Sequence, residues 1–143
     1  MKGIMFSIAA GLFISLQGVF NARVGEKIGF WETNTFVHAT GLAFTLIILL
    51  TAGSGGFSKL GEVNKLYMLG GALGVLIIFS VMKAITALGS TYTIAILLVT
   101  QLISATIIDS FGLFGSQVIK FDITKFLGIA VMIAGIIIFK IKG

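Results

Sequence analysis

The stretch that decides the fold runs from residue 66 to residue 114 and reads LYMLGGALGVLIIFSVMKAITALGSTYTIAILLVTQLISATIIDSFGLF. Lys83 and Asp109 are its only charged residues. A helix needs about 20 apolar residues to cross the hydrocarbon core of a bilayer. The stretch is therefore long enough for two spanning helices, and the short segment at 88–91, which reads LGST, leaves almost no loop between them. We predict a tight helical hairpin in the membrane, with helices over 66–88 and 91–114.

Three more apolar stretches cover residues 4–20, 33–52 and 123–139. Of the 143 residues, 57% are hydrophobic and 10% are charged, whereas a soluble domain carries about 25% charged residues. Long continuous apolar segments favour helices over the short alternating strands of a barrel. We predict an all-α integral membrane protein with five transmembrane helices in a single domain over residues 1–143, and we interpret its first segment as a retained helix rather than a cleaved signal.

Several classes of function are disfavoured by what the sequence lacks. It has no cysteine and only one histidine, His38, so thiolate and histidine-rich metal sites are excluded. It has none of the short motifs that mark nucleotide-binding loops, zinc proteases or serine hydrolases, and we expect neither an enzyme nor a cofactor. The formal charge of +5 comes from cations scattered at segment ends. This pattern fits lipid headgroups rather than nucleic acid.

The charges leave the orientation of the chain in the membrane open. Five spans place the two ends on opposite sides, and Lys83 can extend its amine toward the side of the C-terminus. The cations then fall equally on the two sides, with Lys2, Lys59, Lys65, Lys120 and Lys125 against Arg23, Lys27, Lys83, Lys140 and Lys142. Because positive residues set orientation, the balance permits either one weakly biased topology or insertion in both orientations.

Polar residues within the spans are candidates for function, since they are costly in lipid. Gln17 and Asn21 share one helix face and offer amides for a substrate or for a neighbouring helix. His38 lies on a polar stripe with Asn34, and it can move protons or act only as a structural donor. Thr100 and Ser104, bordered by Gln101, form the most polar wall of the chain and favour a cavity lining.

Two further groups have structural or coupling roles. Asp109 is the only carboxylate predicted to lie well inside a span, where it can couple transport to protons or pair near the membrane edge, for instance with Lys120. Small residues let membrane helices approach closely. We therefore predict packing seams at Gly70, Gly74, Gly128 and Gly135.

An ordered set of motifs resembles the YdcZ-like family of small inner-membrane proteins in the drug/metabolite transporter superfamily. The set comprises Gln17-x3-Asn21-Ala22, the run Leu69-Gly70-Gly71-Ala72-Leu73-Gly74, Ala87-Leu88-Gly89, Gln101-Leu102, Ile108-Asp109-Ser110-Phe111-Gly112, Leu127-Gly128 and Ala134-Gly135. It covers nearly the whole chain. Residues 66–139 also look like the last three helices of the small multidrug resistance transporters.

The resemblance implies one five-helix half of a ten-helix fold made of two inverted repeats. It therefore implies an antiparallel dimer, formed by two copies or by this chain and a related one. Three positions depart from the related patterns. The first helix has no glutamate like that of the small multidrug family, and Thr86 and Ser110 stand where the YdcZ-like pattern tends to have proline and histidine.

The resulting hypothesis is a multi-pass inner-membrane exporter of a small organic solute that works as an antiparallel dimer by alternating access. Its predicted substrate residues are Gln17, Asn21, His38, Thr100, Gln101 and Ser104. The rival hypothesis is a non-transporting assembly partner or regulatory subunit, whose polar residues only hold helices together. A narrow solute channel is a third possibility.

Overall fold

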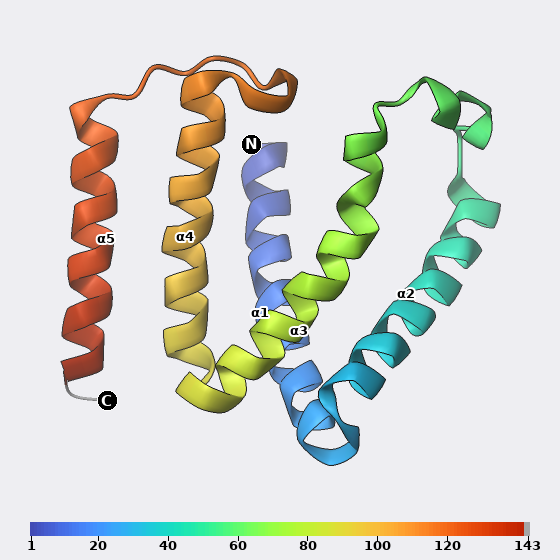
Figure 1. Ribbon diagram of the computed structural model, residues 1–143, viewed down its shortest axis with the longest axis horizontal. Helices are drawn as coiled ribbons and strands as arrows, with labels where there is room; N and C mark the ends of the chain where they lie inside the picture. Colours follow the sequence, from blue (N-terminus) through green and yellow to red (C-terminus); the bar gives the residue numbers. More distant parts are fainter. Residues whose placement is uncertain (142–143) are drawn as a thin grey trace. The chain divides into compact units, whose positions relative to one another are not determined.

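The computed structural model describes residues 1–141 of the chain. Five α-helices, and no strand, occur in this range (Figure 1): α1 Lys2–Ile28, α2 Phe30–Ala52, α3 Gly70–Leu88, α4 Ser90–Phe111 and α5 Ile123–Ile141. Five helices, the third counted from Lys65, are long and apolar enough to cross a membrane. The predicted all-α membrane architecture with five spans is confirmed.

The first two helices extend further than the sequence indicates. Residues 21–32, expected to form a loop, are helical on both sides of Gly29, which alone separates α1 from α2. Gly29 adopts φ 102° and ψ 151°, a conformation that is essentially reserved for glycine. The chain therefore reverses direction at one residue, without a loop of several residues.

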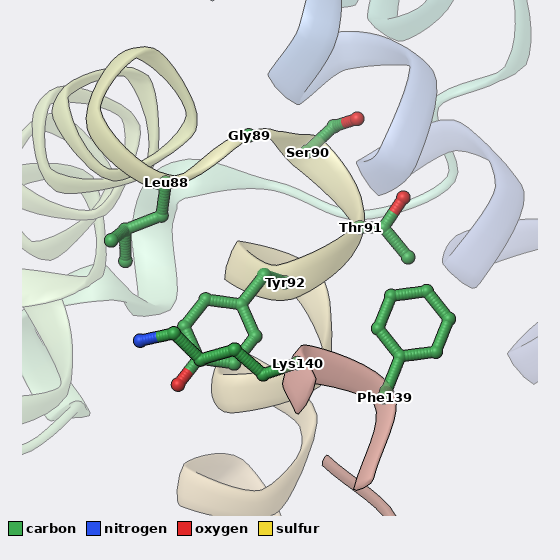
Figure 2. Close-up of a pocket in the computed structure, with 7 residues that line it drawn as sticks. All are labelled: Leu88, Gly89, Ser90, Thr91, Tyr92, Phe139 and Lys140. Carbon is green, nitrogen blue, oxygen red and sulfur yellow. The ribbon is translucent and has the colours of Figure 1, made fainter. Parts of the chain in front are cut away.

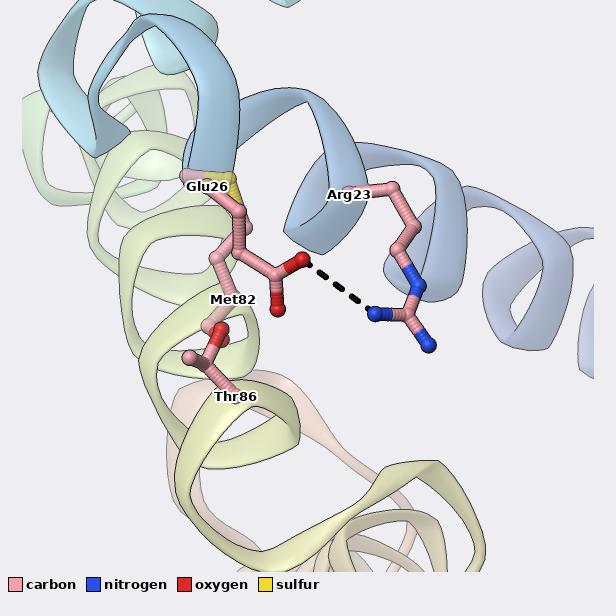
Figure 3. A network of polar contacts seen from close by, with 4 residues as sticks. All are labelled: Arg23, Glu26, Met82 and Thr86. Carbon is pink, nitrogen blue, oxygen red and sulfur yellow. Dashed lines mark hydrogen bonds and ion pairs between the residues drawn. The ribbon is translucent and has the colours of Figure 1, made fainter.

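The C-terminal end of α1 carries charged residues as well as apolar ones. With 27 residues, α1 is about 40 Å long, whereas the hydrocarbon core is about 30 Å thick. Its last turns therefore reach headgroup level or beyond. There Arg23 Nη1 lies 3.2 Å from Glu26 Oε2, in an exposed ion pair drawn as a dashed line in Figure 3.

The third and fourth helices are shorter than predicted. Residues 65–69 form a 3₁₀ turn instead of the first turn of α3, and the Asn64 side chain caps it by accepting a hydrogen bond from the Leu66 amide. At the other end, α4 stops at Phe111 because Gly112 adopts the left-handed conformation, with φ 60°. Asp109 consequently lies in the last turn of α4 rather than well inside a span.

The helices form two compact units, Met1–Ala87 and Leu88–Gly143. In the first unit α1 crosses α3 (Figure 1), and Gly18 meets the side chains of Val81 and Ile85. A Cβ atom added at Gly18 would lie 3.1 Å from Ile85 Cδ1. Further along α1, a Cβ atom added at Gly25 would lie 2.7 Å from the Phe30 ring. Glycines on α1 thus permit close packing within this unit.

In the second unit α4 and α5 run antiparallel and side by side (Figure 1). The segment between them folds back onto the end of α4, where the Asp109 carbonyl accepts hydrogen bonds from the amides of Gly112 and Ile119. Gly128 and Gly135 on α5 contrast with the glycines of α1. An added Cβ atom at either position would meet no described atom within 4 Å.

Candidate functional site

The six predicted substrate residues are divided equally between the two units. Gln17, Asn21 and His38 belong to Met1–Ala87, while Thr100, Gln101 and Ser104 belong to the unit that begins at Leu88.

In the first unit Asn34 and His38 form a polar cluster between α2 and α3. Asn34 is 2% exposed, and its Nδ2 donates a 2.8 Å hydrogen bond to the Val75 carbonyl. Its buried Oδ1 has no hydrogen-bond partner among the described residues. An amide with one end tied to α3 and the other end unsatisfied can hold the two helices together and still accept one more hydrogen bond.

His38 is oriented by the backbone of its own helix. Its Nδ1 lies 2.9 Å from the Asn34 carbonyl oxygen. Because a carbonyl oxygen can only accept, Nδ1 must carry the hydrogen, which leaves Nε2 as the ring nitrogen that can meet another group. Nε2 faces Gly74 of α3, at 3.5 Å from the position of an added Cβ atom. His38 also lines a pocket of about 410 Å³ together with Trp31, Asn34 and Leu42.

An aromatic group beside this cluster joins α2 to α3. The rings of Trp31 and Phe79 stack with their centroids 4.3 Å apart, and Phe30 meets Phe79 edge-on at 6.5 Å. Lys83 Nζ lies 4.4 Å from the centroid of the Phe30 ring. Aromatic residues and a lysine next to a helix end are typical of the membrane–water interface. They therefore indicate that the α1–α2 junction lies near headgroup level.

The two amides of α1 have different environments, although they share a helix face. Asn21 is 8% exposed, whereas Gln17 is exposed. Asn21 lies on a buried stripe with Gly18, Ala22 and Gly25. Its side chain thus belongs to the packed part of α1, while the Gln17 side chain is open.

In the second unit the polar wall of α4 is open. Thr100, Gln101 and Ser104 are all exposed. Thr100 Oγ1 donates a 2.9 Å hydrogen bond to the Ile96 carbonyl, one turn back in the same helix. Gln101 forms no hydrogen bond through its side chain with any residue from 1 to 141. Near the middle of α4, this amide offers both donors and acceptors to a ligand.

Asp109 lines a second pocket, formed by α4, α5 and the segment between them. Its volume is about 540 Å³, and Lys125 rather than Lys120 is the cation that lines it with Asp109. Gly128 forms part of the floor, and the remaining lining is mostly apolar. The position of Asp109 at the end of α4 fits the alternative that this residue lies near the membrane edge.

A third pocket, of about 380 Å³, lies at the opposite end of the α4–α5 pair. Figure 2 shows the Lys140 side chain running along the ring of Tyr92, and Lys140 Nζ lies 4.9 Å from the ring centroid. Ser90 and Thr91, in the first turn of α4, complete the polar part of this pocket. The pairing of tyrosine with lysine is typical of residues that anchor helix ends at the interface.

The two positions that depart from the family pattern are satisfied by their own helices. Thr86 Oγ1 donates a 3.0 Å hydrogen bond to the carbonyl of the buried Met82 (Figure 3). Ser110 Oγ donates a 2.6 Å hydrogen bond to the Thr106 carbonyl. Neither hydroxyl therefore needs a partner from elsewhere.

The sequence reasoning missed two features of these sites. The first is the stacking of Trp31 on Phe79, for which an aromatic residue at a helix mouth was the available signal. The second is that Asp109 and Lys125 line the same pocket. The sequence predicted that α4 ends at residue 114 rather than at Phe111. This prediction placed Asp109 too deep in the membrane to share a site with the start of α5.

The comparisons with known proteins agree with this architecture. Residues 3–138 match the family described as "Putative inner membrane exporter, YdcZ". No curated protein and no solved structure matches the chain. An exporter is a transporter rather than an enzyme, and the five apolar helices fit a multi-pass protein of the inner membrane. The family match covers nearly the whole chain, and the protein therefore belongs to the YdcZ family.

Proposed function

We propose that the protein exports a small organic solute by alternating access, and that two oppositely oriented chains form the working unit. The observation that carries the proposal is the exposure of Gln101 near the middle of α4. An amide at that depth costs several kcal/mol in lipid, so it must face protein or a water-containing cavity. A substrate cavity bordered by Thr100, Gln101 and Ser104 meets this requirement.

The chemistry of the lining suggests the class of substrate. Hydroxyl and amide groups border the proposed cavity, and Gln17, Asn21 and His38 are the proposed contributors from the first unit. No carboxylate lies among these six residues. A neutral or amphiphilic solute that forms hydrogen bonds fits such a lining at least as well as a cation.

The open glycines of α5 support the proposed pairing of two chains. Gly128 and Gly135 lie seven positions apart, so they recur on one helix face, and each has open space around it. Small residues of this kind are the usual contacts between membrane helices. The equal division of cations between the two sides permits insertion in both orientations, which an antiparallel pair of identical chains requires.

Transport is tested with the purified chain in liposomes loaded with a defined mixture of neutral, amphiphilic and cationic solutes. Mass spectrometry of the medium outside the liposomes should detect saturable release of a subset of these solutes. Gln101→Ala should keep its helical circular dichroism and lose flux by about tenfold or more, because a hydrogen bond to substrate is removed. Ile107→Ala, an exposed apolar position on α4, is the matched control and should retain flux.

Three results would count against the proposal, and two of them would favour another function. Flux that survives Gln101→Ala in full would remove the cavity assignment. No loss of any solute under any gradient would favour the non-transporting assembly partner, and loss that never saturates would favour a channel.

The pairing is tested by labelling Ser58→Cys with an impermeant thiol reagent in the cysteine-free chain. Sealed membranes of both orientations are compared. Labelling from both faces supports two opposite insertions. Labelling from one face only excludes the pair of identical chains and leaves a pair with a related chain.

A further inference from the structure

The pocket at the end of the α4–α5 pair combines three chemical features that the proposed transport cavity does not use. Asp109 presents a carboxylate and Lys125 an amine, and both line the same space of about 540 Å³. Leu102, Ile129 and Met132 provide apolar walls. A volume of this size is typical of a pocket for a small organic group.

The two opposite charges in this pocket do not neutralise each other. Among residues 1–141 the only ion pair is that between Arg23 and Glu26. Lys125 Nζ donates one hydrogen bond, of 3.0 Å, to the Lys120 carbonyl, which leaves two of its three hydrogens available. The Asp109 carboxylate has no hydrogen-bond partner in this part of the chain. A ligand that carries both an ammonium and an anion would satisfy both groups.

The depth of the pocket narrows the choice of ligand. Asp109 lies in the last turn of α4, and Lys125 lies in the first turns of α5. The pocket therefore begins at the level of the lipid headgroups. Its apolar walls continue from there along α4 and α5 toward the hydrocarbon core, past Gly128, which adds no side chain.

We propose that this pocket binds a bilayer phospholipid whose headgroup carries a primary ammonium and a phosphate, namely a phosphatidylethanolamine. The ammonium donates hydrogen bonds to the Asp109 carboxylate, and the phosphate accepts them from Lys125. One acyl chain lies along Leu102, Ile129 and Met132. A choline headgroup has no N–H to donate to Asp109, and a glycerol headgroup has no cation. The inference goes beyond the proposed transport and does not depend on it.

The test is native mass spectrometry of the full chain in detergent, titrated separately with phosphatidylethanolamine, phosphatidylcholine and phosphatidylglycerol of the same acyl composition. Phosphatidylethanolamine should bind about tenfold more tightly than the other two, as expected for a charge-assisted hydrogen bond. Asp109→Asn should abolish this preference, and Lys125→Gln should weaken the binding of phosphatidylethanolamine. Asp122→Asn, which changes an exposed carboxylate outside the pocket, should leave it unchanged.

The comparison of the three lipids uses the unsubstituted chain, so it stands even if a variant fails to fold. Equal binding of all three lipids would overturn the proposal, as would a preference that persists in Asp109→Asn. Failure of the full chain to bind any of the three lipids would also overturn it. None of these results depends on flux, so this test and the transport test can fail independently.

Discussion

Asn34 and Gly25 in the first unit and Gln101 and Gly128 in the second unit lie in opposite environments. In Met1–Ala87, Asn34 is buried and bonded to the Val75 carbonyl, and Gly25 lies against the Phe30 ring. In the unit from Leu88 onward, Gln101 is exposed and Gly128 has open space around it. The same residue types thus hold the first unit together and remain available in the second.

This difference distinguishes polar residues that hold helices together from polar residues that are available to a ligand or a partner. A polar side chain in a membrane helix must be satisfied, and the first unit largely does so internally. The exposed groups of α4 and α5 need a substrate, a lipid or another chain. We therefore expect substitutions in the first unit to change stability most, and substitutions in the second unit to change binding and transport most.

The largest effect on stability is expected from Gly25→Leu. Its side chain would enter the space of the Phe30 ring and Met82 Sδ, and overpacking of this kind costs about 1–3 kcal/mol. Unfolding by sodium dodecyl sulfate in mixed micelles, followed by circular dichroism, measures the change. Gly11→Leu is the matched control, because Gly11 lies on the same helix and an added Cβ atom there would meet no described atom within 4 Å. It should leave the free energy of unfolding nearly unchanged. Equal destabilisation by both variants would show that the close approach to the Phe30 ring is not what Gly25 contributes.

The two single-residue joints provide the next comparison. Gly29 and Gly89 both have positive φ, at 102° and 81°, so Gly29→Ala and Gly89→Ala should each cost about 1–3 kcal/mol. A Cβ atom at Gly29 would also meet the Glu32 carboxylate, whereas Gly89 has open space around it. Gly29→Ala should therefore be the more damaging of the two in the same unfolding assay. The reverse order would show that the α1–α2 joint is not the tighter one.

A smaller effect is expected at the buried amide of the first unit. Asn34→Ala leaves the Val75 carbonyl without its side-chain donor, and membrane hydrogen bonds of this kind contribute about 0.6–1.7 kcal/mol. Gln101→Ala removes an amide that bonds to no other described side chain, so its free energy of unfolding should change less. A greater loss of stability from Gln101→Ala would assign it a structural role.

The smallest effect is expected from Arg23→Ala. The Arg23 side chain is 76% exposed in its pair with Glu26, and a surface pair of this kind contributes at most about 1 kcal/mol. The unfolding midpoint should therefore barely move. A large shift would mean that the end of α1 is more buried in the membrane-embedded protein than in the isolated chain.

Hydropathy was sufficient to predict the five helices, because only long apolar segments can cross a bilayer. The bounds of α1, α2 and α4 were harder to predict from hydropathy than the existence of the helices. Gly29 reverses the chain in one residue, and Gly112 ends α4 through its left-handed conformation. Both effects depend on backbone dihedral angles. A glycine in the sequence permits these angles but does not require them.

The candidate site was predictable only in part for a related reason. Helical spacing placed Gln17 and Asn21 on one face, yet it does not specify which neighbour covers that face. Only the structure separates the buried Asn21 from the open Gln17. The stacking of Trp31 on Phe79 joins residues far apart in the sequence, and no local pattern contains such a contact.

The most direct test of the account measures whether water reaches the middle of α4. Single cysteines are introduced by Gln101→Cys and Ile107→Cys and treated in native membranes with a water-soluble, membrane-impermeant thiol reagent. The residue at 101 should react, and a transported solute should slow the reaction, while the residue at 107 should stay unreactive in lipid. If the residue at 101 is as unreactive as that at 107, α4 lines no aqueous cavity, and the proposed export pathway is contradicted.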